Sequence, residues 1–151
     1  MVSCTEFIPL YSELFKFIEE KEGRKGVVKY WEHIRDEYVE PRLGVLAAEK
    51  GIAACWEYWS KSLNEEAADF TMTFDDEAEE FVIDMRYCPS KGILDECGHI
   101  EPYYDYCGHC AVLYAPVLAR FGIESEEDYS HTDRAACRLK FYIPKKQEGK
   151  S

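Results

Sequence analysis

The sequence predicts an α+β fold in which helices come first and an antiparallel sheet of about four strands follows. Two observations carry this prediction. Apolar residues recur at helical spacing over the first 64 residues, and from residue 70 onward they alternate with polar ones. The length of 151 residues is that of one ordinary domain. We therefore expect a single domain over residues 1–144 and a short, lysine-rich, disordered tail over residues 145–151.

Three helical segments are predicted before the sheet. The first covers residues 7–18 and is broken at Gly23, since glycine adopts helix-ending conformations freely. The second covers residues 27–38, and we expect it to end near Pro41. The third covers residues 43–59. Each has an apolar stripe, which predicts that these helices cover one face of the sheet.

The strands are predicted as two hairpins. Residues 70–74 and 81–86 alternate in polarity around an acidic turn, and this pattern predicts a hairpin with one buried face. Residues 123–130 and 135–143 form the second pair. In the last strand Cys137 shares the apolar parity, so we expect its side chain on the inner face.

A helical stretch is predicted between the two hairpins. Residues 89–97 suit a short helix or a loop. A longer helix is expected to start at Pro102, because proline is tolerated in a first turn, and to run to Phe121. Pro116 should kink that helix, and Gly122 should cap it.

The charge balance excludes several classes of partner. Eighteen basic residues against thirty acidic ones give a net charge of −12, which argues against binding to nucleic acid or to anionic membranes. No apolar run approaches the roughly 20 residues of a membrane span. The first ten residues lack the features of a signal peptide, so we expect a cytoplasmic protein that acts on a small molecule.

Seven cysteines are the main candidates for chemistry. In a reducing compartment such residues are structural, catalytic, redox-active or metal-bound. Cys107 and Cys110 would share one face of a helix, an arrangement that suits disulfide exchange, metal ligation or a nucleophile with a helper. Asp105 and His109 would also share a face, and their pairing would orient the imidazole as an acid or a base.

Two further cysteines are expected to approach the same helix. Cys88 ends the second strand, and Cys137 lies on the inner face of the last one. Together with Cys107 and Cys110 they would form one site, which suits zinc or iron if a metal is bound at all. His131, in the turn before the last strand, is expected to reach a pocket at the edge of the sheet.

The second half of the chain resembles the L-2-amino-thiazoline-4-carboxylic acid hydrolase family. The resemblance covers about residues 69–143 and follows an ordered pattern of three spaced cysteines, of which the middle one is Cys107 or Cys110. The residues that carry it are Cys88-Pro89, Tyr106-Cys107-Gly108-His109-Cys110, Leu113-Tyr114, Pro116, Gly122, His131 and Ala136-Cys137-Arg138.

This resemblance implies hydrolytic opening of a cyclic amidine or a related ring. A cysteine thiolate, or a hydroxide on a cysteine-held metal, would attack the ring, and His109 or His131 would move protons. Arg86 or Arg138 would hold the substrate carboxylate, and Tyr106 and Tyr114 would line the substrate site. Two alternatives stay open from the residues alone. One is a cysteine-ligated metal- or small-ligand-binding module, and the other is a thiol–disulfide oxidoreductase using Cys107 and Cys110.

Overall fold

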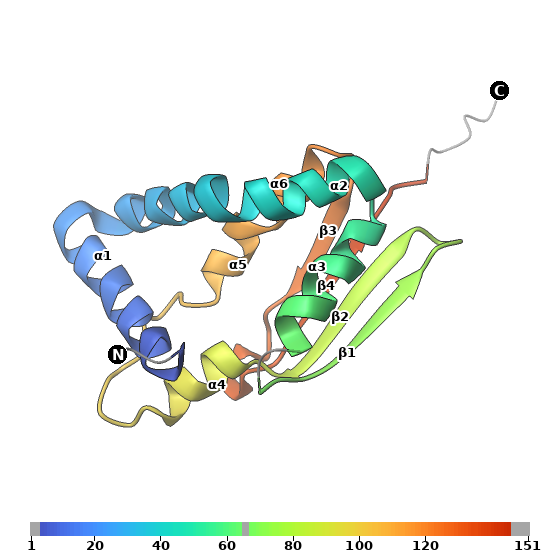
Figure 1. Ribbon diagram of the computed structural model, residues 1–151. Helices are drawn as coiled ribbons and strands as arrows, with labels where there is room; N and C mark the ends of the chain where they lie inside the picture. Colours follow the sequence, from blue (N-terminus) through green and yellow to red (C-terminus); the bar gives the residue numbers. More distant parts are fainter. Residues whose placement is uncertain (1–3, 65–66, 146–151) are drawn as a thin grey trace.

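The chain folds as a mixed α+β structure in the computed structural model, which describes residues 4–64 and 67–145 (Figure 1). Its sheet is antiparallel and has four strands in the order β1-β2-β4-β3. These strands are β1 (Asp69–Asp75), β2 (Glu80–Tyr87), β3 (Glu124–Asp128) and β4 (Cys137–Tyr142). The predicted fold class is confirmed. The lysine-rich tail predicted over residues 145–151 lies, from residue 146 onward, outside the described residues.

The N-terminal helices form a long, bent path. Helix α1 (Cys4–Ile34) is interrupted at Gly23, whose φ of 71° is the left-handed conformation that glycine tolerates. The expected end near Pro41 is wrong, because the chain continues there as a π-helix, η1 (Arg35–Gly44). Pro41 lies inside this π-helix and donates no hydrogen bond there, because proline lacks a backbone N–H. Helices α2 (Val45–Lys50) and α3 (Ala53–Asn64) follow.

The helices between the hairpins are shorter than the sequence predicts. Helix α4 (Pro89–Glu96) follows β2, then α5 (Gly108–Leu113) and α6 (Ala115–Ala119) are separated at Tyr114. The predicted start at Pro102 is wrong. The backbone N–H of Tyr103 donates to Ser12 Oγ at 2.8 Å, and Asp105 pairs with Arg24, so this segment is held against α1. Its own backbone hydrogen bonds are those of turns, such as that from the N–H of Tyr106 to the carbonyl of Tyr103 at 3.0 Å.

One face of the sheet is covered by helices and the other is not (Figure 1). Residues of β2 alternate between buried and less buried positions, with Phe81, Ile83 and Met85 facing inward. Helix α3 packs on β1 and β2, and α6 packs beside β3. A short 3₁₀ turn, η2 (Thr132–Arg134), joins β3 to β4.

The buried apolar residues form two clusters. The larger lies between the helices and the sheet and includes Leu43, Trp59, Phe81, Leu118 and Phe141. The smaller is built on α1 and includes Phe15, Val27, Trp31, Leu94, Tyr103 and Tyr106. Cys88 and Cys137 pack against the larger cluster and Cys107 packs against the smaller, so the cysteines predicted to form one site are divided between the two clusters.

Candidate functional site

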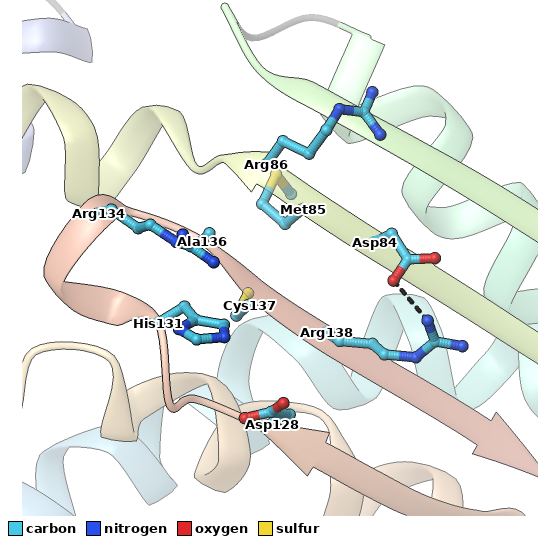
Figure 2. Close-up of a pocket in the computed structure, with 9 residues that line it drawn as sticks. All are labelled: Asp84, Met85, Arg86, Asp128, His131, Arg134, Ala136, Cys137 and Arg138. Carbon is cyan, nitrogen blue, oxygen red and sulfur yellow. Dashed lines mark hydrogen bonds and ion pairs between the residues drawn. The ribbon is translucent and has the colours of Figure 1, made fainter.

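A pocket of about 490 Å³ lies where β2 ends and β4 begins. We call it the sheet-end pocket. It combines three arginines, two aspartates, a histidine and a cysteine in one small surface depression (Figure 2). The lining residues are Asp84, Met85, Arg86, Asp128, His131, Arg134, Ala136, Cys137 and Arg138.

Strand register brings these residues together. Met85 of β2 is opposite Cys137 of β4, and Asp84 is opposite Arg138, so both strands contribute at the same level. Charged and apolar side chains alternate along each strand, and the charged ones face away from the core. The turn before β4 is anchored by the backbone N–H of Cys88, which donates to the carbonyl of Ala135 at 2.7 Å.

Four of the residues singled out from the sequence line this pocket: Arg86, His131, Cys137 and Arg138. The other six do not line it, and they are Cys88, Tyr106, Cys107, His109, Cys110 and Tyr114. The candidate residues therefore divide into a surface group and a more interior group. Cys137 connects the two, because it lines the pocket and also interacts with the interior thiols.

The interior group contains the thiol cluster, which we define as Cys88, Cys107, Cys110 and Cys137. Burial raises the pKa of Cys107, of Cys110 and of Cys137 to about 12. For Cys137, charge interactions with Cys110, Cys88 and Cys107 are smaller contributions to the same rise in pKa. The four thiols thus lie close enough to influence one another, and the three with a raised pKa keep their protons at neutral pH.

His109 and Cys110 form a hydrogen-bonded pair within this interior group. His109 Nδ1–H donates to the carbonyl of Tyr106, which leaves Nε2 to accept from the Cys110 thiol at 3.6 Å. Burial lowers the pKa of His109, so its ring is neutral at pH 7. The predicted pair of Asp105 and His109 does not form, because the Asp105 carboxylate is paired with Arg24.

The two tyrosines proposed for substrate binding lie mainly in the core. Tyr106 is 3% exposed, and its hydroxyl is 2.7 Å from Ser90 Oγ. With Cys107 it lines a second, smaller pocket of about 150 Å³. The ring of Tyr114 packs edge-on against Trp59 at 5.3 Å between ring centres. Both tyrosines therefore make mainly packing contacts within the core, and neither lines the sheet-end pocket.

The thiol cluster does not have the geometry of a metal centre. Within residues 4–64 and 67–145, no three His, Cys, Asp or Glu side chains are arranged to hold a metal ion. The four-cysteine ligand set considered from the sequence is therefore not assembled as such.

None of the helices that the structure describes is both long and apolar enough to cross a bilayer.

Three charged residues of the sheet-end pocket were missed by the sequence reasoning: Asp84, Asp128 and Arg134. Asp128 ends an acidic run that reads as solvated surface, and Arg134 belongs to a turn whose polar residues are ordinary for turns. The outward parity of Asp84 beside Arg86 was a usable signal for that residue.

No family model, curated protein or solved structure matches this chain.

Proposed function

We propose that this protein is a hydrolase that opens a small cyclic amidine bearing a carboxylate, with the sheet-end pocket as its substrate site. The observation that carries the proposal is the meeting of Arg86, His131, Cys137 and Arg138 in one pocket of about 490 Å³. Arg86 comes from β2, and the other three come from the turn before β4 and from the start of that strand. The volume is in the usual range for small-molecule sites.

The charge of the pocket supports an anionic group on the substrate. The chain has a net charge of −12, yet this pocket has three arginines against two aspartates. Arginine binds a carboxylate with paired hydrogen bonds, so the guanidinium groups of the pocket suit an anionic group on the substrate. A 2-amino-thiazoline-4-carboxylate, the substrate class that the family resemblance implies, has such a group.

The proposed reaction uses Cys137 as the nucleophile and His131 as the proton carrier. Burial raises the pKa of Cys137 to about 12, so the resting thiol needs a base. His131 takes the thiol proton while the sulfur attacks C2 of the ring. The ring C–S bond then breaks, and the departing sulfur takes the proton from His131. Water attacks the same carbon, which releases N-carbamoyl-cysteine and restores the Cys137 thiol.

A non-catalytic binding module for small anions is the second candidate. It is favoured by the raised pKa of the three thiols, since reactive cysteines usually have a lowered one. The same observation disfavours a redox dithiol at Cys107 and Cys110. We further propose the cytoplasm as the location, because Cys55, Cys97, Cys107, Cys110 and Cys137 form no disulfide, as is usual in a reducing compartment.

The test is turnover of 2-amino-thiazoline-4-carboxylate, followed by mass spectrometry of N-carbamoyl-cysteine. The proposal expects turnover by the wild type and its loss in Cys137→Ser and His131→Gln. Cys97→Ser is the matched control, because Cys97 is also partly buried but does not line the pocket. Binding without turnover would favour the second candidate. Turnover that survives Cys137→Ser would remove the proposed nucleophile.

A further inference from the structure

Two of the three pocket arginines are already occupied by the protein itself. Arg86 Nε donates to Asp69 Oδ1 at 3.0 Å, and its Nη1 donates to Thr71 Oγ1 at 2.8 Å. Arg138 Nη1 donates to Asp84 Oδ1 at 2.7 Å (Figure 2). Binding a ligand carboxylate through either residue would compete with these contacts, so neither is the best anchor.

Arg138 forms an ion pair with Asp84 and not with Asp128. Arg138 is directly opposite Asp84 on β2 and directly opposite Asp128 on β3, so it has a carboxylate on each side. Its guanidinium pairs with Asp84. Hydrogen bonds from Ser130 lower the pKa of Asp128, which is therefore a carboxylate at neutral pH. Among the residues that the structure describes, Asp128 has no ion pair.

Arg134 is the third arginine, and it too lacks an ion pair within the described part of the chain. Its backbone is fixed by the turn before β4: the N–H of Arg134 donates to the carbonyl of His131 at 3.2 Å, and the N–H of Ala136 donates to the same carbonyl at 3.1 Å. Ala135 between them is left-handed, with a φ of 55°. The turn thus holds an available guanidinium at the pocket.

The two unpaired charges stand on opposite sides of the proposed reacting groups. In Figure 2, Arg134 lies on one side of His131 and Cys137, and Asp128 lies on the opposite side. Because all four residues line the same pocket, a ligand that contacts both Arg134 and Asp128 would lie beside Cys137 and His131. A ligand with one negative and one positive end would neutralise both charges, and neither existing ion pair would have to break.

We propose that the sheet-end pocket recognises small zwitterions, with Arg134 binding the carboxylate and Asp128 binding an amidinium or ammonium group. This inference rests on the proposed function for the place of the reacting atoms, and it narrows the substrate class. A protonated 2-amino-thiazoline-4-carboxylate has both charges at opposite ends of a small ring. Asp128 would hold the protonated amidine, whose C2 is then most open to attack by Cys137.

The experiment compares three probes by isothermal titration calorimetry on the Cys137→Ser protein. They are 2-amino-thiazoline-4-carboxylate, its methyl ester, which lacks the anion, and 2-methyl-thiazoline-4-carboxylate, which lacks the exocyclic amine. The zwitterion should bind roughly tenfold to a hundredfold more tightly than either single-charge probe, as expected for hydrogen bonds between charged groups.

Two substitutions then assign each end of the ligand. Arg134→Met should abolish the advantage of the zwitterion over the ester, and Asp128→Asn should abolish its advantage over the 2-methyl probe. Asp133→Asn and Arg120→Met are the controls, because both residues are exposed charges that do not line the pocket. Equal binding of all three probes, or equal effects of the controls, would overturn the inference.

Turnover by the wild type, measured in parallel, separates this inference from the proposed function. Zwitterion-selective binding without turnover would support the inference and reject the hydrolase. Turnover that is unaffected by Arg134→Met and Asp128→Asn, in both the KM and the kcat, would reject the inference and keep the hydrolase.

Discussion

Replacing Trp59 by alanine tests how α3 is held on the sheet that carries Cys137. Trp59 is 4% exposed, and its ring stacks on both Phe81 and Phe141, with ring centres 5.7 and 5.1 Å away. A buried tryptophan hides roughly 200 Å². At about 25 cal/mol per Å² that area is worth about 5 kcal/mol. We therefore expect Trp59→Ala to lower the free energy of unfolding by roughly 3–5 kcal/mol.

Trp56 provides a matched control in the same helix. It is 43% exposed, so its truncation removes less buried area and leaves no closed cavity. The same arithmetic predicts that Trp56→Ala costs about 2 kcal/mol less than Trp59→Ala. Urea unfolding followed by far-UV circular dichroism should then give midpoints about 1 M apart, for an m-value of about 2 kcal/mol per M. Equal midpoints would refute the packing described for α3.

Two other predictions concern the thiol cluster and helix α4. Because burial raises the pKa of three thiols to about 12, the folded chain retains protons that the unfolded chain releases above about pH 9. The free energy of unfolding should therefore fall between about pH 8 and pH 10, and a urea midpoint that stays level or rises would contradict this sign. A Cβ added at Gly92 would overlap the ring of Tyr87, so Gly92→Ala should cost roughly 1–3 kcal/mol. A Cβ added at Gly98 would meet nothing within 4 Å, so Gly98→Ala should leave thermal unfolding nearly unchanged. A similar loss of stability in both variants would contradict the overlap at Gly92.

The strands were the most predictable part of the fold. Period-two alternation located both hairpins, because one face of β2 and of β4 is more buried than the other, and the less exposed positions of β1 and β3 alternate in the same way. The helix boundaries were less predictable, since they depend on distant contacts. Ser12 and Arg24 of α1 bind the segment after Pro102, and no local pattern shows that this contact competes with helix formation.

The candidate site was predictable in its residue types and less so in its grouping. The turn position of His131 predicts a pocket at the edge of the sheet, and His131 lines the sheet-end pocket. The inward parity of Cys137 predicts an approach to residues 107–110 and gives no sign that Cys137 also lines this pocket. Arg134 and Asp128 gave no signal, because isolated charges in turns and acidic runs look like ordinary surface. The roles proposed for these two residues depend on which ion pairs form around them, and the register of β2, β4 and β3 determines those pairs.

The most direct test of the account is where a cyclic amidine binds. Amide ¹H–¹⁵N shifts should be mapped on labelled Cys137→Ser protein titrated with 2-amino-thiazoline-4-carboxylate. The account predicts that the largest shifts fall in residues 84–86 and 128–138, which form the sheet-end pocket. Shifts concentrated instead on residues 103–110, or no shifts at saturating ligand, would contradict the assignment of this pocket as the substrate site.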